Sequence, residues 1–227
     1  MRAQMQRIFL HELLPGLDRV LYLDSDIVLL SDVQSLWQHF DRFHEEHALG
    51  MARAAEHYVL GFFLLADLKH PIYEPYGLNT GVLLMDLARL RAFNWSEKAH
   101  RACEEYGNVT DLYVNDQMLI NIVLAEFPEK AYVLGCEWNV HWVHCINECA
   151  RSRRARGVRL LHGATRAFHR DSLSRLVPVY RAVYLAFQQI VDTAKSCHRH
   201  DRHDPAEKYI RSRLAQLSAL DRETTGI

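Results

Sequence analysis

The sequence has no strong excess of charge of either sign, no long apolar run and no internal repeat. Its formal net charge is −1, from 27 basic and 28 acidic residues among 227. Such a balance gives no electrostatic basis for binding nucleic acid or an anionic membrane surface. No apolar stretch reaches the roughly 18 residues that a membrane-spanning helix requires, and residues 1–7 lack the apolar core of a signal peptide. The interpretation that remains is a folded globular domain.

The bulk composition is typical of one such domain. Hydrophobic residues make up 49% of the chain and charged residues 24%, and this length suits one domain or one domain with a tail. A polar run rich in His, Arg and Asp, residues 197–204, follows the last long apolar segment. We therefore expect a folded domain over residues 1–195 and a polar C-terminal tail over residues 196–227, with a helix near 205–220.

The order of apolar segments predicts an α/β fold. Strands are expected at residues 20–23, 48–53, 82–85, 131–134 and 158–161. Helices are expected at residues 3–14, 31–43, 86–93, 95–106, 115–126 and 174–190. Strands that alternate with helices are typical of α/β proteins. A long aromatic-rich segment, residues 57–76, is either a binding element or a packed insertion.

The strand expected at residues 20–23 leads directly into two carboxylates, Asp24 and Asp26, with Ser25 between them. In an extended chain, residues i and i+2 point to the same side, so both carboxylates could meet one ion. Two partly buried carboxylates repel each other, which favours a positive charge between them. Mn²⁺ or Mg²⁺ suits such oxygen ligands and keeps positions open for phosphates. The alternative is a solvated turn or a helix start, although the apolar strand argues against it.

A second apolar strand, expected at residues 158–161, ends in His162 and Gly163. A neutral imidazole there would complete a set of two Asp and one His, which suits Mn²⁺. Gly163 would let a ligand approach the backbone. The alternative for His162 is a hydrogen-bonded histidine of the core. Arg166 follows, where it could meet a phosphate or make a surface salt bridge.

Two further polar pairs stand at the ends of apolar segments. Asn79 and Gly81 place a polar group and a bare backbone before the strand expected at residues 82–85. Asp116 and Gln117 open an apolar helix, where an ordinary acidic helix start is the alternative. Both pairs are therefore candidates for contacts with a polar ligand.

The segment from residue 136 to residue 149 combines aromatic, cysteine and histidine side chains. Trp138 and Asn139 put an aromatic face beside a polar edge, which suits sugar binding, and a buried tryptophan with a satisfied N–H is the equally common alternative. The cysteines of the chain are Cys103, Cys136, Cys145, Cys149 and Cys197. A zinc site would use Cys145, Cys149, His141 and His144, but this spacing matches no standard finger. Two sequons, at 94–96 and 108–110, favour a secretory chain with a disulfide in this cluster.

Taken together, these motifs resemble those of glycosyltransferase family 8. The resemblance rests on residues 21–28, residues 78–85, the pair Asp116–Gln117 and the pair His162–Gly163. Within that family, residues 136–149, 161–163 and 180–184 look most like the glucoside xylosyltransferases. The resemblance covers residues 4–190. It implies that residues 1–195 are a catalytic domain of the GT-A fold, with a mixed sheet, in a retaining and metal-dependent enzyme that uses a nucleotide-sugar.

The resemblance also implies a role for each motif residue. The metal ligands would be Asp24, Asp26 and His162. The donor would be bound by Arg7, Asp24, Ser25, Asp26, Asn79, Gly81, Gly163 and Arg166. Asp116 and Gln117 would lie beside the sugar at the reaction centre, and Trp138 and Asn139 would bind the acceptor.

The implied reaction is transfer of xylose from UDP-xylose to O-linked glucose in an α-1,3 linkage, with Mn²⁺ or Mg²⁺ as cofactor. The implied acceptor is an O-glucosylated EGF-like repeat, such as those of Notch. The implied location is the Golgi or ER lumen, with a single-pass membrane anchor in the full-length form. Another UDP-sugar, or a non-catalytic remnant that binds sugar or a partner, stays open as an alternative. Because family members carry βα units for the uracil and ribose before the metal pair, we expect an N-terminally truncated domain.

Overall fold

The computed structural model divides the chain into two compact units, residues 1–162 and residues 163–227, and each is described by itself. The described residues are 3–54, 70–107, 115–141, 157–164, 168 and 178–197. Several expectations lie outside them, namely the helix near 205–220, most of the aromatic segment, the sequon at 108–110 and the cysteines of the zinc alternative.

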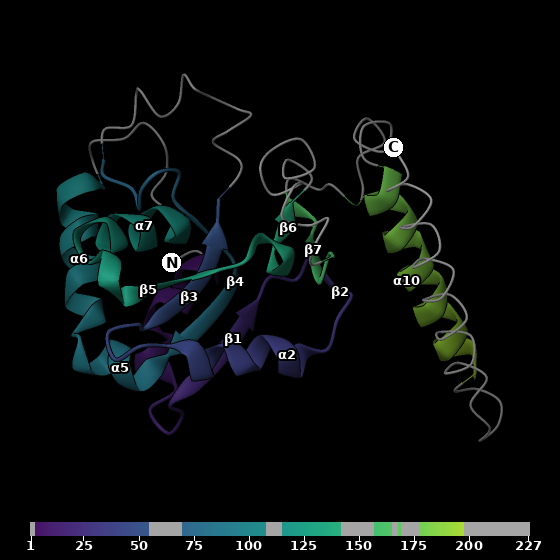
Figure 1. Ribbon diagram of the computed structural model, residues 1–227, viewed down its shortest axis with the longest axis horizontal. Coiled ribbons are helices and arrows are strands. Elements are labelled where there is room, and N and C mark those ends of the chain that lie inside the picture. Colours follow the sequence, from purple (N-terminus) through teal and green to yellow (C-terminus); the bar gives the residue numbers. More distant parts are fainter. Residues whose placement is uncertain are drawn as a thin grey trace. The chain divides into compact units, whose positions relative to one another are not determined.

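A four-stranded sheet forms the centre of the first unit (Figure 1). In spatial order its strands are β1 (Arg19–Leu23), β4 (Leu78–Asp86), β3 (Leu49–Arg53) and β5 (Ala131–Leu134). Strand β4 lies antiparallel to both β1 and β3, whereas β3 and β5 run parallel. All four strands lie where their apolar runs predict them, and together with the helices they confirm the expected α/β class.

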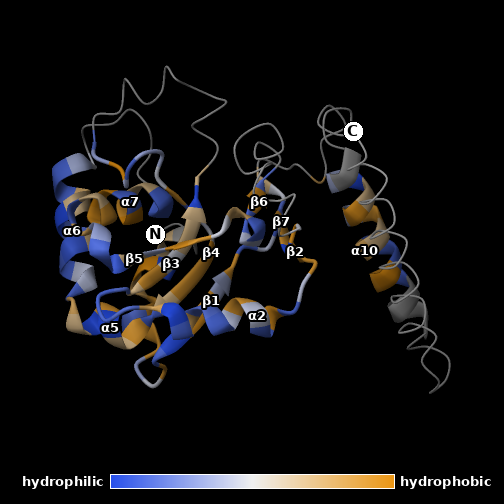
Figure 2. Cartoon of the chain, in the orientation of Figure 1, coloured by the Kyte–Doolittle hydropathy of each residue, from blue (hydrophilic) through white to orange (hydrophobic). Residues whose placement is uncertain are grey.

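Side chains alternate between the two faces of this sheet, as the pleat of a strand requires. Along β4, Leu83 and Met85 pack into one hydrophobic cluster, whereas Val82 and Leu84 pack into another. All nine residues of β4 are buried, which explains why its sequence is a continuous apolar run. Figure 2 shows the same contrast between hydrophobic central strands and helices of mixed polarity. The polar start of β4 is therefore held inside the unit.

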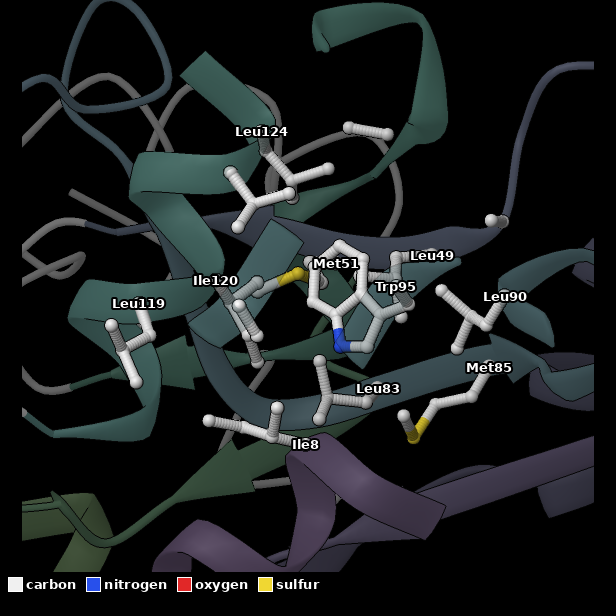
Figure 3. Close-up of a cluster of buried hydrophobic side chains, with 14 of the residues drawn as sticks. Ile8, Leu49, Met51, Leu83, Met85, Leu90, Trp95, Leu119, Ile120 and Leu124 are labelled. Atoms are coloured by element: carbon white, nitrogen blue, oxygen red, sulfur yellow. The ribbon is translucent and has the colours of Figure 1, made fainter. Parts of the chain in front are cut away.

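Helices cover the first face of the sheet. They are α5 (Leu87–Ala92), α6 (Trp95–Tyr106) and α7 (Asp116–Glu126), close to the expected ranges. Figure 3 shows Trp95 of α6 among Leu49, Met51 and Leu83 of the strands, with Ile120 of α7 beside them. The N-terminal segment packs into the same cluster, as a 3-10 helix η1 (Ala3–Phe9) followed by α1 (Leu10–Leu13) in place of one continuous helix.

The second face is covered by α2 (Val33–Trp37) and the 3-10 helix η2 (Gln38–Arg42). Leu36 and Phe40 from these elements pack with Val82 and Leu84. Asp32 caps α2, because its side chain accepts a hydrogen bond from the backbone N–H of Gln34.

A second, three-stranded sheet lies beyond the end of β1. Its strands, in spatial order, are β2 (Ile27–Leu29), β7 (Leu160–His162) and β6 (Val140–His141). The 3-10 turns η3 (Pro128–Lys130) and η4 (Cys136–Trp138) flank β5 on the way to β6. Ile27 pairs with His162 across the antiparallel β2–β7 ladder. This pairing sets the end of β7 beside the carboxylates that precede β2.

The described part of the second unit is dominated by α10 (Pro178–Cys197), which overlaps the helix expected at 174–190 and continues past residue 190. Tyr180 is buried, its ring lies 5.6 Å from that of Phe168, and Arg181 donates to the Phe168 carbonyl. Among the described helices, α10 included, none combines the length and apolar character that a bilayer crossing needs.

Candidate metal centre and its surroundings

Asp24, Asp26 and His162 come together in the first unit, and one ligand atom from each lies within 4.8 Å of the others. Nε2 of His162 lies 3.4 Å from Oδ1 of Asp26 and 3.9 Å from Oδ2 of Asp24. The expected extended conformation is wrong, because the chain turns between β1 and β2 at Ser25 and Asp26. The turn, rather than the pleat of one strand, brings the two carboxylates to one point.

The donor set fits a hard divalent cation. Two carboxylates and an imidazole suit Mn²⁺, and Mg²⁺ accepts the same oxygens. The side chain of His162 is 4% exposed while that of Asp26 is 43% exposed, so the cluster is anchored inside and open on one side. The adjacent His162 ring holds the pKa of Asp26 below its ordinary value, against the effect of burial. Asp26 is therefore a candidate ligand that is ionised at neutral pH.

The His162 ring is held from behind by two buried amides. Its Nδ1 lies 2.9 Å from Oδ1 of Asn139, and Nδ2 of Asn139 donates to Oδ1 of Asn79 at 2.8 Å. The same Asn79 oxygen accepts the backbone N–H of Gly81 at 2.9 Å. The carbonyl of Gly81 in turn accepts the N–H of Asp24 at 2.9 Å. The polar start of β4 thus supports both the histidine and one carboxylate.

Gly81 also makes room for the His162 ring. A Cβ atom at position 81 would lie 2.1 Å from Cε1 and 2.6 Å from Nδ1 of that ring, distances that no side chain tolerates. The ring therefore packs directly on the bare backbone of β4. This contact explains why position 81 has to be glycine, which the sequence pattern alone did not show.

The change Gly81→Ala is expected to displace His162 and to weaken Mn²⁺ binding by at least about 10-fold, as loss of an orienting contact does at metal sites. Overpacking should also lower the free energy of unfolding by about 1–3 kcal/mol. Isothermal titration with Mn²⁺ and chemical denaturation measure the two effects. Gly16→Ala is the matched control, because nothing lies within 4 Å of a Cβ there. Unchanged Mn²⁺ affinity in Gly81→Ala would contradict the placement of His162.

Arg7 connects the metal cluster to the start of α7. Its NH2 lies 2.9 Å from Oδ1 of Asp24, and its Nε lies 2.9 Å from Oδ2 of Asp116. Its NH1 donates to the carbonyl of Thr80 at 2.8 Å, and its guanidinium carbon lies 4.4 Å from the centre of the Tyr22 ring. The side chain is 5% exposed, so the guanidinium is a buried bridge between two carboxylates.

Asp116 and Gln117, at the start of α7, lie beside the guanidinium of Arg7 and the backbone of Thr80. Burial raises the pKa of the Asp116 carboxyl, although the charge of Arg7 acts in the opposite direction. Its place in the first turn of α7 suits a carboxylate, because that end of a helix is positive. Oε1 of Gln117 accepts the backbone N–H of Thr80 at 3.1 Å, which ties α7 to the start of β4.

The other expected site residues are placed as follows. Ser25 is exposed in the turn between the carboxylates. Trp138 is buried in the second hydrophobic cluster, which agrees with the alternative of a core tryptophan, and Asn139 is 1% exposed behind His162. Gly163 follows His162 in sequence but belongs to the second unit, and Arg166 lies outside the described residues.

Sequence reasoning missed Asn121, which fixes the start of β4 from α7. Its Oδ1 accepts the N–H of Leu78 at 2.6 Å, and its Nδ2 donates to the carbonyls of Leu78 and Gln117, both at 2.8 Å. Gly77, with φ of +80°, turns the chain beside this amide. A lone polar residue within the apolar run of α7 was the available signal.

Comparison with known proteins identifies relatives over most of the chain. A family model described as Glycosyl transferase family 8 matches residues 3–162. The chain is 35% identical over 198 residues to glucoside xylosyltransferase 1 of Danio rerio, covering 81% of this chain and 47% of the relative. It is 31% identical over 192 residues to glucoside xylosyltransferase 2 of Xenopus laevis, covering 79% and 44%. The chain spans about half the length of the curated relatives that it matches.

Solved structures agree with the fold. Mouse xyloside xylosyltransferase 1 in its apo form has a TM-score of 0.51 at 22% identity, covering 70% of this chain and 62% of that one. The galactosyltransferase LgtC, in complex with donor and acceptor sugar analogues, has a TM-score of 0.56 at 19% identity, covering 79% and 65%. Both are glycosyltransferases of the GT-A fold, so the expected fold is confirmed.

Proposed function

Since this chain belongs to glycosyl transferase family 8, we propose that it carries the metal- and donor-binding centre of a retaining enzyme that transfers xylose from UDP-xylose. The proposed acceptor is an O-linked glucose on an EGF-like repeat, and the new linkage is α-1,3. The observation that carries the proposal is the convergence of Asp24, Asp26 and His162 from two sheets onto one point. The choice of xylose is supported by the glucoside xylosyltransferases among the curated relatives.

Mn²⁺, or Mg²⁺ in its place, is the proposed cofactor, held by Asp24, Asp26 and His162. When bound, such an ion orients a diphosphate and offsets the negative charge that develops on a leaving nucleotide. Contacts within the protein hold the proposed ligands in place. Arg7 balances the negative charge of Asp24, and the buried amides hold the His162 ring. The half-exposed side of Asp26 is the side open to a donor.

The other donor contacts are assigned by proximity to this cluster. Asn79 and Gly81 lie directly behind His162 and Asp24, where they line the inner end of the site. The guanidinium of Arg7 adds positive potential beside the position of a diphosphate. Ser25, Gly163 and Arg166 complete the proposed donor set. Trp138 and Asn139 remain the proposed acceptor residues. Because both side chains are buried, we propose that they act through the position of the segment that contains them.

Retention of configuration leaves two routes. One uses two displacements through a carboxylate nucleophile, and the other uses attack on the same face, with the leaving phosphate oxygen taking the proton of the acceptor. We favour attack on the same face, because Asp116 is held in an ion pair with Arg7 and is 5% exposed. A carboxylate bound in this way is poorly placed to attack a sugar carbon.

Asp116→Asn distinguishes the two routes. Attack on the same face predicts that this variant keeps transfer within about 10-fold of wild type, because the amide keeps the shape of the carboxylate. A required nucleophile predicts a loss of several orders of magnitude, as seen when other catalytic nucleophiles are removed. Single-turnover transfer and a search for a glycosyl-enzyme by mass spectrometry provide the measurements. A trapped covalent intermediate on Asp116 would contradict the favoured route.

The proposed function is tested by a panel of donors with the full chain. Metal is removed with EDTA and Mn²⁺ is restored, and UDP-xylose, UDP-glucose and UDP-galactose are each offered with an O-glucosylated peptide. Mn²⁺-dependent transfer of xylose supports the proposal. Transfer of a hexose instead overturns the donor assignment, and saturable Mn²⁺ binding without any turnover identifies a binding remnant.

The proposed compartment is the lumen of the secretory pathway. Cys136 is disulfide-bonded, and disulfides persist mainly in oxidising compartments. Cys103 is free and exposed, so the two cysteines differ in their chemistry. Mass spectrometry of non-reduced peptides from the expressed protein would identify the bond at Cys136.

A further inference from the structure

A chain of three buried hydrogen bonds runs from the backbone of β4 to the back of the His162 ring. It passes from the N–H of Gly81 to Oδ1 of Asn79, from Nδ2 of Asn139 to the same oxygen, and from Nδ1 of His162 to Oδ1 of Asn139. The side chains come from β4, from the link between η4 and β6, and from β7. Asn79, Asn139 and His162 are 6%, 1% and 3% exposed.

The backbone end of this series of hydrogen bonds fixes which group donates in each of them. The N–H of Gly81 can only donate, so the atom of Asn79 that faces it is the carbonyl oxygen. That oxygen can only accept, so Asn139 turns its NH2 group toward Asn79. Asn139 therefore turns its own carbonyl oxygen toward His162, and the ring nitrogen that meets this oxygen has to carry a hydrogen.

We propose that Asn139 is a positioning residue that keeps a hydrogen on Nδ1 of His162, so that Nε2 is the nitrogen available to a divalent cation held with Asp24 and Asp26. The metal part of this proposal rests on the proposed function, whereas the position of the hydrogen does not. Orientation of a ligating histidine through its second nitrogen is a general device of metal sites. Here the device begins at a backbone amide rather than at a carboxylate.

The packing around the ring supports a single orientation. The ring lies on the backbone of Gly81, and the ring of His141 meets it edge-on with centres 5.7 Å apart. A ring turned over would place a carbon against Oδ1 of Asn139 and lose that hydrogen bond in a buried place, which costs about 1–3 kcal/mol. Asn139 therefore selects both the ring orientation and the nitrogen that carries hydrogen.

Two substitutions of equal size separate this role from simple packing. Asn139→Leu removes the oxygen that faces Nδ1, whereas Asn139→Asp keeps an oxygen there, and both lose the N–H that Asn139 donates to Asn79. Isothermal titration of each variant with Mn²⁺ is expected to show about 10- to 100-fold weaker binding for Asn139→Leu. Asn139→Asp is expected to bind Mn²⁺ at least as tightly as wild type. Equal losses in both variants, or binding of Asn139→Leu within about two-fold of wild type, would overturn the proposal.

NMR spectroscopy tests directly whether Nδ1 of His162 carries a hydrogen. With ring-¹⁵N histidine in the metal-free chain, and with His162→Gln used to assign the signal, wild type and Asn139→Asp should show a protonated Nδ1 at His162. Asn139→Leu should show loss or rapid exchange of that proton. An unprotonated Nδ1 in wild type would overturn the proposal, even if Asn139→Leu fails to fold.

The same pair of measurements separates failure of this proposal from failure of the proposed function. If wild type shows no saturable Mn²⁺ binding, the metal assignment fails, and the wild-type spectrum alone decides where the hydrogen lies. If wild type binds Mn²⁺ but Nδ1 is unprotonated, the metal assignment stands and the role of Asn139 fails.

Discussion

Asp26→Ala is expected to lower sugar transfer by at least about 10²-fold, in line with the loss of a principal electrostatic stabiliser. Asp26 supplies one of the three converging ligand atoms. The adjacent His162 ring holds the pKa of the Asp26 carboxyl below its ordinary value, so the lost group is a charged one at neutral pH. Asp26→Asn, which keeps the shape but not the charge, should lose nearly as much.

The fold should tolerate this change. The Asp26 side chain is 43% exposed, and partly exposed pairs of this kind contribute only about 0–1 kcal/mol to stability. The thermal midpoint in EDTA should therefore stay close to that of wild type, while Mn²⁺ affinity falls. Asp41→Ala is a matched control, because Asp41 is an exposed aspartate of η2. Transfer by Asp26→Ala at the wild-type rate would contradict the assignment of Asp26 as a metal ligand.

The strands that carry the site could be predicted because apolar runs mark them. The strand before Asp24 and the strand before His162 each end where polarity begins, and β4 is a buried run that starts at a polar motif. A strand buried on both faces has to be apolar throughout. Polar residues at the ends of such strands therefore stand out in the sequence as candidates for one site.

Other parts of the site could not be predicted, because they depend on pairing between distant segments. Strands β2 and β6 have three and two residues, too few to show a period, yet they bring His162 to the carboxylates. Asn139 meets Asn79 across 60 positions of sequence. Nothing local in either segment indicates that partner, so the contact of Asn139 with the histidine could not be predicted from the sequence.

The ion-pair partners of Arg7 could not be predicted from the sequence either. The family resemblance implies that Arg7 binds the donor, and the structure adds that its guanidinium lies between two carboxylates. A long side chain from η1 can reach Asp116 only because η1 packs against α7 in the same core. Charge balance inside the site is thus decided by the tertiary fold.

Arg7→Leu is expected to lower the free energy of unfolding by about 3–5 kcal/mol, because it leaves a buried charge without its partner. Asp116 bears most of this cost, since its side chain is 7% exposed while that of Asp24 is 26% exposed. Arg19→Leu is the control. Arg19 is 39% exposed and its partner Asp86 keeps Arg89, so the loss there should be about 1 kcal/mol or less.

A double-mutant cycle identifies the cause. If the cost of Arg7→Leu is an uncompensated carboxylate, then Asp116→Asn in the same chain should recover part of it, and the two changes should be non-additive by at least about 1 kcal/mol. Urea denaturation of the two single variants and the double variant measures this coupling. Additive losses would show that Arg7 stabilises the unit through its contacts with Asp24, the Thr80 carbonyl and the Tyr22 ring rather than through Asp116.

The pH dependence of the same variant gives an independent check. Burial already raises the pKa of Asp116 with Arg7 present, and removal of the guanidinium should raise it further. A folded pKa above the unfolded one means that the folded state binds more protons between the two values, so the free energy of unfolding falls as pH rises through that range. The loss caused by Arg7→Leu should therefore be smaller near about pH 5 than near about pH 8, and Asp116→Asn should abolish this difference. A loss that does not change with pH would mean that Asp116 is not the charge that Arg7 compensates.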